Sequence, residues 1–256
     1  MRKTDWIGFL TILRKEYIRI VRIWSQTLLP PTINVSLYLL IFGGFIGNRI
    51  GLIGNITYAE FIVPGLIMMS VITNAYANVS TSFFSAKFQK NIEEILVSPL
   101  PESLIVLGYT FGGIIRGVLV ATCVTMIVYI FIPVTVMHPF WALLLLFLTA
   151  AFFSLAGLFN ALFAKKFDDI SFIPTFVLTP MTYLGGIFYS IQNLPPFWKN
   201  VSEINPILHI VNAFRYAFWG ASDTSPVVAF IFLIIGNILL FVLCTLYLKR
   251  GLGIRN

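Results

Sequence analysis

Charged residues are scarce in this 256-residue sequence: Asp, Glu, Lys and Arg make up 11% of it, against about 25% in an average soluble domain. Hydrophobic residues make up 58%, which is more than a soluble core of this length could bury. The chain has only two cysteines, Cys123 and Cys244, with no CxxC spacing, so a disulfide framework and a paired-cysteine metal site are excluded. We expect both cysteines to be reduced structural thiols inside membrane spans.

The sequence also lacks the motifs of the common enzyme classes. There is no GxxxxGK[ST] phosphate-binding loop and no HExxH zinc motif, and the two histidines, His138 and His209, are isolated. We therefore expect no catalytic residue, no metal site and no cofactor in this chain. If its activity is driven by ATP, a separate subunit must bind the ATP and Mg²⁺.

Long apolar stretches dominate the sequence instead. A membrane-spanning helix needs about 20 mostly apolar residues, and six stretches are long enough. The predicted spans are Thr27–Ile46, Tyr58–Phe84, Leu104–Phe131, Phe140–Ala164, Ile170–Ser190 and Val227–Leu248. This pattern predicts an all-α membrane protein with one transmembrane domain over residues 1–256, in which residues 27–190 hold spans one to five and residues 227–248 hold span six.

The basic residues are distributed unequally between the two sides of these spans. On one side we count Arg2, Lys3, Arg14, Lys15, Arg19, Arg22, Lys87, Lys90, Lys165, Lys166, Lys249, Arg250 and Arg255, and on the other Arg49, Lys199 and Arg215. Lys and Arg accumulate in cytoplasmic loops, so both termini are predicted to be cytoplasmic. The net charge of +7 is thus a topology signal, and nucleic acid is not expected as a partner.

Residues 1–26 are predicted to form an amphipathic helix at the cytoplasmic membrane surface. Apolar residues recur at helical spacing, with the basic residues elsewhere on the helical wheel. The apolar set is Trp6, Leu10, Leu13, Tyr17, Ile20, Val21 and Trp24. The helix either anchors the first span, which lacks a cleavage site for signal peptidase, or has a direct mechanical role.

A second amphipathic helix is predicted in the cytoplasmic loop between residues 85 and 103. Apolar and acidic residues share it, and Pro99 and Pro101 end it. They are Phe88, Ile92, Ile95 and Leu96, with Glu93 and Glu94 beside them. One interpretation is packing against lipid headgroups or the N-terminal helix. The other is a docking helix whose apolar residues fill a groove of a partner and whose glutamates meet basic residues there.

The external segment of residues 191–226 is too apolar and aromatic for an ordinary solvated loop, yet too short to cross the membrane twice. Two short re-entrant or interfacial helices within residues 194–219 are expected, carrying Trp198 and His209, with Arg215 near the headgroups. They either anchor the chain at the interface or cap the exit of a pathway.

Arg116 is the one charge predicted deep inside a span, and Glu60 lies about one turn into the second span. A buried arginine is costly in a membrane, so Arg116 has either polar structural partners or a place in a translocation path. Gly112, Gly113 and Gly117 around it would allow another helix to approach closely. A transporter driven by an ion gradient would need a buried acid, for which Glu60 is the sole candidate.

Four segments together resemble the permease subunits of ABC-2 type exporters. They are FIVPGLIMMSVITNAYANVS (61–80), KFQKNIEEILVSPLP (87–101), KKFDDISFIPTFVLTPMTYLGGIFY (165–189) and INPILHIVNAFR (204–215). The resemblance covers nearly the whole chain. It implies the type V exporter fold in a bacterial inner membrane, with an interfacial helix before six spans, short re-entrant helices before the last span, and export of a substrate.

The same resemblance implies partners. Two copies of the permease, expected to be a homodimer, would pair through their first and fifth spans, and two ATP-binding subunits would dock on the cytoplasmic side. Docking would use the loop of Phe88, Ile92, Glu93, Glu94 and Ile95, helped by the N-terminal helix and by residues 165–169.

If a path for substrate runs along the seam of that dimer, polar residues of the first, second and fifth spans would line it. The candidates are Asn34, Tyr38, Asn74, Asn78, Thr179 and Tyr183, although such side chains also join helices to each other. The alternative from a different class is a non-transporting membrane scaffold or assembly factor that binds a partner through the same loop.

Overall fold

The computed structural model describes residues 3–53 and 56–251. Two of the basic residues counted for topology, Arg2 and Arg255, lie outside this range. In chain order the elements are α1 (Lys3–Arg22), α2 (Trp24–Tyr38), the π-helix η1 (Leu39–Ile46), α3 (Gly47–Ile50), β1 (Leu52–Ile53), β2 (Ile56–Thr57), α4 (Tyr58–Phe88), α5 (Asn91–Val97), α6 (Glu102–Phe131), α7 (Pro139–Phe163), α8 (Phe167–Ile173), the π-helix η2 (Pro174–Leu178), α9 (Thr179–Tyr183), the 3₁₀ helix η3 (Ile191–Asn193), α10 (Pro196–Ile204), α11 (Pro206–Trp219) and α12 (Pro226–Lys249).

Within the described residues, 5 helices are long and apolar enough to cross a membrane. They correspond to five of the predicted spans, and the helices are Trp24–Ile46, Tyr58–Phe88, Glu102–Phe131, Pro139–Phe163 and Pro226–Lys249. The multi-pass helical architecture predicted from the apolar stretches is therefore present.

The fifth predicted span, residues 170–190, takes a different form. It is a shorter helical run of α8, η2 and α9 that ends at Tyr183 instead of Ser190. Pro174 begins the π-helical turn and Pro180 follows it, and proline removes a backbone donor from the helix interior. At 1.5 Å per residue the run from Phe167 is about 26 Å long, slightly less than the roughly 30 Å of a bilayer core.

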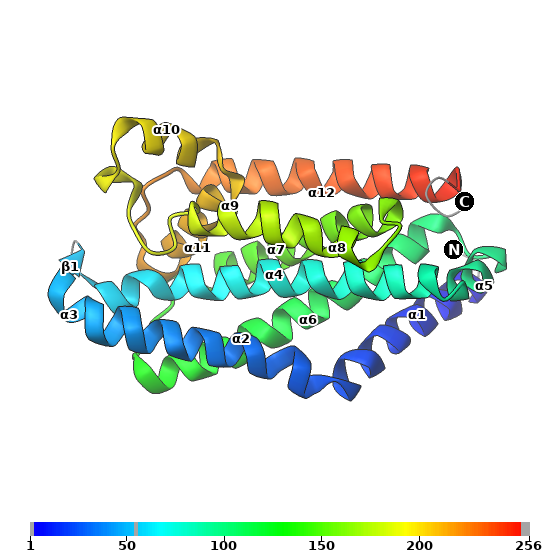
Figure 1. Cartoon of the computed structure of the whole chain (residues 1–256), viewed down its shortest axis with the longest axis horizontal. Helices are drawn as coiled ribbons and strands as arrows, with labels where there is room; N and C mark the ends of the chain where they lie inside the picture. The colour runs from blue at the N-terminus through cyan, green and yellow to red at the C-terminus, as the bar shows by residue number, and fades with distance from the viewer. Residues whose placement is uncertain (1–2, 54–55, 252–256) are drawn as a thin grey trace.

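Helix α4 forms the centre of the bundle, between α6 and α7 (Figure 1). In its apolar 18-residue window 78% of the residues are buried, compared with 11% in that of the first span, Trp24–Ile46, which is formed by α2 and η1. Glycines allow the close approach around it: a Cβ atom at Gly157 of α7 would lie 2.5 Å from the carbonyl oxygen of Tyr76. The close approach predicted at Gly112, Gly113 and Gly117 is confirmed, because Cβ atoms there would meet Glu16, Ser154 and Ala150.

Helix α1 uses a different face than the sequence indicated. Its predicted apolar stripe is largely exposed, with Trp6 and Tyr17 each 52% exposed. Of that stripe Ile20 is buried, and it shares the face that packs on the bundle with Phe9, Ile12 and Glu16, which are also buried and were not in the predicted stripe. The interpretation of α1 as a helix with one apolar face on lipid was thus incomplete, because its other face is part of the protein core.

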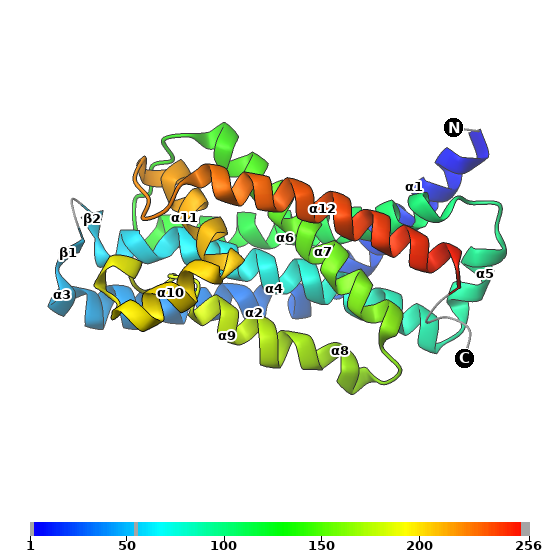
Figure 2. The same cartoon turned by 90° about the horizontal axis from the view of Figure 1, so that it is seen from above.

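The two ends of the bundle differ. Helix α5, the first turn of α1 and the last turn of α12 lie at one end, which we call the α5 end (Figures 1 and 2). The β1–β2 hairpin, in which Leu52 pairs with Thr57, lies at the opposite end with α3 and α10, and we call this the α10 end. This arrangement agrees with the predicted alternation of loops between two sides.

Candidate functional site

A polar cavity of about 280 Å³ lies between α2, α4 and α6. Its walls include four residues singled out from the sequence: Asn34 and Tyr38 from α2, Asn74 from α4 and Arg116 from α6. Asn34 is exposed at its edge, whereas Asn74 and Arg116 are partly buried. The structure thus brings together three of the six predicted path residues with the intramembrane arginine, and we call this space the seam cavity.

Arg116 reaches α4 across the seam cavity. Its Nη2 atom donates a hydrogen bond of 3.1 Å to Oδ1 of Asn74, whereas its Nε atom is buried without a partner. Asn74 itself donates from Nδ2 to the carbonyl oxygen of Ser70, at 3.0 Å. Of the described residues that line the cavity, none is acidic.

Pro30 and Pro31 add backbone polarity to the same cavity. Helix α2 begins at Trp24, so both prolines lie inside it. Proline has no N–H group, so the carbonyl oxygens four residues earlier, at Gln26 and Thr27, lose their usual helical donors. Such backbone is tolerated in membranes where it faces a polar cavity, and both prolines and Gln26 line this one.

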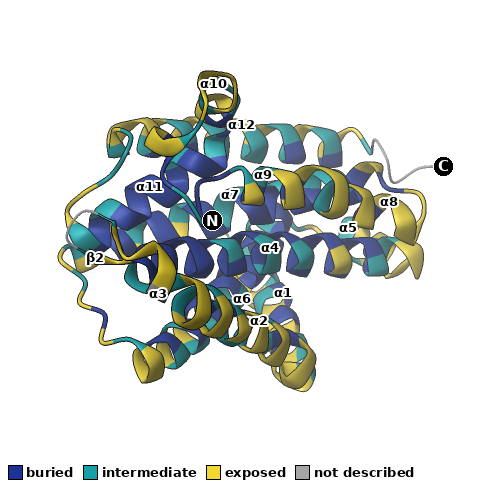
Figure 3. Cartoon of the chain, turned by 60° about the vertical axis from the view of Figure 1, so that its left-hand side comes forward, coloured by how far each residue is buried: buried dark blue, intermediate teal, exposed yellow. Residues whose placement is uncertain are grey.

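The two predicted path residues of the fifth span, Thr179 and Tyr183, are not among the residues that line the cavity. The hydroxyl of Tyr183 lies 3.2 Å from that of Tyr38, which links α9 to α2. Thr179 is exposed, and its Oγ1 donates to the carbonyl oxygen of Pro174 at 2.9 Å. Exposed residues of α2 and of α8–α9 flank the buried α4 on one face of the bundle (Figure 3).

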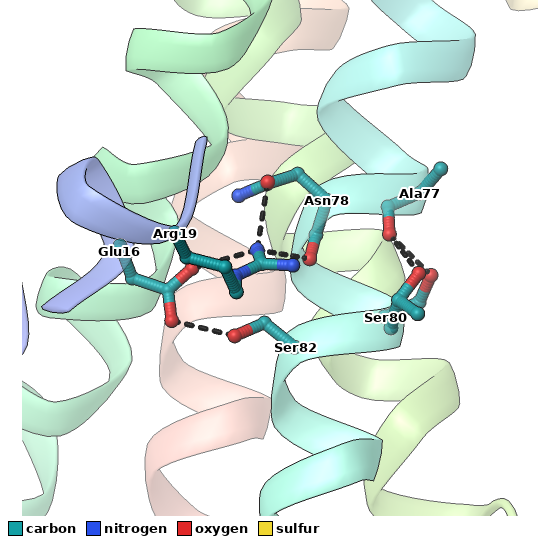
Figure 4. A network of polar contacts seen from close by, with 7 residues as sticks. Glu16, Arg19, Ala77, Asn78, Ser80 and Ser82 are labelled. Atoms are coloured by element: carbon teal, nitrogen blue, oxygen red, sulfur yellow. Dashed lines mark hydrogen bonds and ion pairs between the residues drawn. The ribbon is translucent and has the colours of Figure 1, made fainter. Parts of the chain in front are cut away.

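Asn78 belongs to a separate polar network between α1 and α4 (Figure 4). Arg19 of α1 donates from Nη2 to the Asn78 side-chain oxygen at 2.7 Å and to its carbonyl oxygen at 3.0 Å. The same nitrogen lies 2.9 Å from the carboxylate of Glu16, whose second oxygen accepts a bond of 2.5 Å from Ser82. Asn78 is therefore fully buried in this network and does not line the seam cavity.

Sequence reasoning missed Glu16, although its side chain is fully buried. The available signal was an acidic residue three positions before Arg19, on a helix whose other charges are nearly all basic. Because Asn74 and Asn78 are one helical turn apart on α4, the Glu16–Arg19 network and the Arg116–Asn74 bond lie in one column of polar contacts. This column passes from α1 to the seam cavity.

The predicted docking helix is divided between two elements. Phe88 is the last residue of α4, Lys90 has a left-handed backbone with φ of 62°, and α5 follows from Asn91. Ile92 is 1% exposed and belongs to the core, so its predicted place in the groove of a partner is wrong: it fixes α5 to the bundle. Glu93 and Glu94 are exposed and Ile95 is half-buried.

A second cavity, of about 620 Å³, separates α5 from the end of α12. Glu93, Val97 and Glu102 line one part of it and Lys249 and Arg250 the other. The side chain of Val97 is 86% exposed. This groove was not predicted, because residues 93 and 249 are far apart in the sequence.

The turn between α7 and α8 lies beside this region and is held by two charged side chains. Lys87 donates from Nζ to the carbonyl oxygens of Leu162 and Ala164, at 2.8 and 2.7 Å. Asp169 accepts from the amides of Lys165 and Lys166 at 2.8 and 2.9 Å, and these bonds hold the pKa of its carboxyl below the usual value of 3.8. Phe88 also packs on Phe167 of this turn, with ring centroids 5.1 Å apart.

At the α10 end, Arg215 is 4% exposed, so its expected position near the lipid headgroups is wrong. Its guanidinium donates to Asn212 at 2.7 Å and to the carbonyl oxygen of Gly186 at 2.8 Å, and it lies 3.9 Å from the ring centre of Phe61. His209 joins α11 to α10 through the carbonyl oxygen of Glu203, at 2.8 Å. Trp198 is 48% exposed on α10.

Glu60 has a local structural role. Its carboxylate accepts from the amide of Thr57 at 2.7 Å and from the Thr57 hydroxyl at 2.8 Å, which completes a capping box at the start of α4. Such a box satisfies backbone donors that the first helical turn leaves free. Glu60, the acid that a gradient-driven transporter would have used, thus caps the N-terminus of α4.

Comparison with known proteins gives consistent results. The sequence model of a family described as ABC-2 type transporter matches residues 8–219. The inner membrane transport permease YadH of Escherichia coli strain K12 is 52% identical over 251 residues, which cover 98% of this chain and 98% of that protein. Nodulation protein J of Rhizobium leguminosarum bv. viciae is 22% identical, over 96% of this chain and 95% of that protein.

Proposed function

This chain belongs to the ABC-2 type transporter family, and from that premise we propose that it is the permease half of an ATP-driven exporter. It is a membrane transport permease, and the relative of 52% identity is named as one of the inner membrane. We assign ATP hydrolysis to a separate subunit. In this proposal two such subunits bind two permease copies at the α5 end, which is the cytoplasmic side, and a substrate leaves the membrane at the α10 end.

One observation carries this proposal: a single helix, α4, joins the seam cavity to the α5 end. Asn74 of α4 lines the cavity, and α4 continues without a break to Phe88, three residues before α5 begins. A force applied to α5 is therefore transmitted directly to a wall of the cavity. This is the mechanical connection that an exporter needs between its ATPase and its path.

The surface chemistry at the α5 end suits a protein partner. Glu93, Glu94 and Val97 are exposed around a groove, and Phe88 is 62% exposed beside them. Aromatic and apolar residues at the centre of a contact with charges at its edge are the usual composition of an interface. We propose that a basic region of the ATPase meets the two glutamates while an apolar side chain enters the groove.

The proposed pairing of two copies through α2 and α8–α9 is supported by polar side chains that are exposed on these helices. Asn34 lies near the middle of the first span, Trp24–Ile46, and is exposed in the single chain, and Tyr183 is 45% exposed. Polar side chains in spans usually face the protein interior or a water-filled cavity, not lipid. A second copy of this chain laid against α2 and α9 would cover them and close the seam cavity.

The test of the proposal is purification of the tagged chain from native membranes by gentle extraction, with identification of the proteins that accompany it. We expect an ATP-binding subunit in equal amount, and ATP hydrolysis by the sample. The double variant Glu93→Ala and Glu94→Ala should lose the subunit or its hydrolysis. Glu203→Ala is the matched control, because this exposed glutamate lies on α10 at the other end.

Two results would contradict the proposal. If the chain were recovered alone, without ATP hydrolysis, it would act as a membrane scaffold or assembly factor. If the ATPase were retained equally well by the double variant and by Glu203→Ala, docking would lie elsewhere than at α5.

A further inference from the structure

We propose that the seam cavity binds a negatively charged oxyanion group, such as a phosphate or a carboxylate, of the transported molecule, and that Arg116 holds this group. The inference rests on the proposed transport function and specifies its substrate class. It rests on the positive charge of Arg116, beside which no described acidic residue lines the cavity.

Arg116 stands in the middle of α6, a helix of 30 residues, at a depth where a charge is expensive. Its hydrogen bond goes to a neutral amide, Asn74, and its Nε atom has no partner. The other charges in the polar column are Arg19 and Glu16, which already pair with each other. Among the described residues, no acidic side chain that lines the cavity therefore balances the charge of Arg116.

The shape and the other walls of the cavity fit an anionic headgroup. The guanidinium group is planar and offers several donors, a geometry that matches carboxylate and phosphate oxygens. Asn34, Gln26 and Thr73 add polar side chains around it. A volume of about 280 Å³ is at the lower limit of small-molecule sites, so the cavity has room for a headgroup and not for a whole large substrate.

The competing explanation is that Arg116 merely holds α6 against α4 through Asn74. The two roles make different predictions for ligand binding. A structural arginine would affect stability equally in the presence and absence of anions. A binding arginine would determine how much an anion stabilises the protein, because a ligand that binds only the folded state stabilises it by an amount that rises with the logarithm of its concentration divided by its Kd.

The experiment measures the thermal midpoint of the purified full chain in a neutral detergent while one probe is added at increasing concentration. The probes are short-chain phosphatidylglycerol, phosphatidylcholine with the same acyl chains, and sodium phosphate. The proteins are the native chain, Arg116→Gln, Arg116→Lys and Lys199→Gln. The last is the matched control, since it removes one positive charge from α10, away from the cavity.

We expect phosphatidylglycerol to raise the midpoint of the native chain and of Lys199→Gln. In Arg116→Gln the affinity should be at least about tenfold weaker, because the charged hydrogen bonds are lost. The affinity of Arg116→Lys should be intermediate, since lysine keeps the positive charge but lacks the planar arrangement of several N–H donors. A shift with sodium phosphate that also depends on Arg116 would identify a soluble anion as the ligand, and a shift with phosphatidylglycerol alone would identify a lipid headgroup.

The inference is overturned if neither anion shifts the midpoint, if phosphatidylcholine acts as strongly as phosphatidylglycerol, or if Arg116→Gln responds like Lys199→Gln. Should Arg116→Gln fail to fold, Asn34→Leu gives the same test. It replaces a polar wall residue of α2 with an apolar one and leaves Arg116 in place, and it should weaken the response to the anion. Because no ATPase or ATP is present, failure here leaves the proposed function standing, and failure of ATPase docking leaves this result standing.

Discussion

Breaking the buried ion pair between Glu16 and Arg19 from one side should weaken the packing of α1 on the bundle. We consider Glu16→Ala. The side chain of Glu16 is 0% exposed and that of Arg19 is 26% exposed. The substitution removes the carboxylate that accepts from Arg19 at 2.9 Å and from Ser82 at 2.5 Å, and it leaves the guanidinium charge with Asn78 alone.

The expected size of the effect follows from this geometry. Removing one partner of a buried ion pair typically costs about 3 to 5 kcal/mol. Arg19 keeps its bonds to Asn78 and is partly exposed, so we reduce the estimate to about 2 to 3 kcal/mol. For a protein of this length that corresponds to a fall in the unfolding midpoint of about 4 to 12 °C.

A thiol-reactive fluorescent dye can measure this midpoint. Cys244 is 0% exposed, so it reacts only when the bundle opens, and a Cys123→Ala background removes the half-buried thiol of α6. The control is Glu16→Ala combined with Arg19→Leu. Since replacing both members of a buried pair is often nearly neutral, this double variant should be more stable than Glu16→Ala alone.

The reasoning is refuted if Glu16→Ala has the native midpoint. It is equally refuted if the cost of Glu16→Ala is the same with Arg19 and with Leu at that position, because the two residues would then have no coupling free energy.

Three further predictions use the same dye assay. Gly112→Ala should cost about 1 to 3 kcal/mol, since its Cβ atom would lie 2.8 Å from both Cβ and Cγ of Glu16, and only the part of this cost that comes from Cγ should vanish in the Glu16→Ala background, because alanine keeps Cβ. Lys87→Met should cost about 1 to 3 kcal/mol, because it leaves the last carbonyl oxygens of α7 without their donor. Backbone hydrogen bonds from Lys165 and Lys166 lower the pKa of Asp169 in the folded state below its usual value of 3.8, so its stabilising contribution is complete above that value and is lost as the pH falls through the folded pKa. The midpoint difference between native and Asp169→Asn should therefore be present at about pH 7 and shrink as the pH falls below 3.8.

The helical membrane architecture could be predicted because the bilayer imposes a strict rule on sequence. A spanning segment must satisfy its own backbone hydrogen bonds and be apolar for about 20 residues, and five of the predicted spans meet this rule in the structure. The fifth span was extended too far, to Ser190, because residues 184–190 are also apolar but turn back toward α10. Gly186, with φ of 68°, allows that turn.

Which face of a helix meets the protein could not be predicted from its periodicity. Ile92 and Ile95 follow the same apolar pattern, yet Ile92 is in the core and Ile95 is half-buried. Glu16 is buried because Gly112 leaves room for it on another helix, a relation between residues far apart in the sequence. The acceptor of Arg215, the carbonyl oxygen of Gly186, comes from a loop 29 residues away. The sequence does not show this contact, so Arg215 was expected at the membrane surface.

The proline inside α4 is a point about which the rest of this helix could bend, and residues farther from it would then move farther. Pro64 lies near the α10 end of α4, and a proline within a helix is a common point of bending. From there to Phe88 the helix extends about 36 Å, and to Asn74 about 15 Å. A rotation of about 5° about Pro64 would thus carry the α5 end by about 3 Å and Asn74 by about 1.3 Å. That smaller displacement of Asn74 is enough to break its hydrogen bond of 3.1 Å with Arg116. A movement of about 3 Å at the α5 end would thus change the hydrogen bonding of Arg116, the residue that we propose binds the anion.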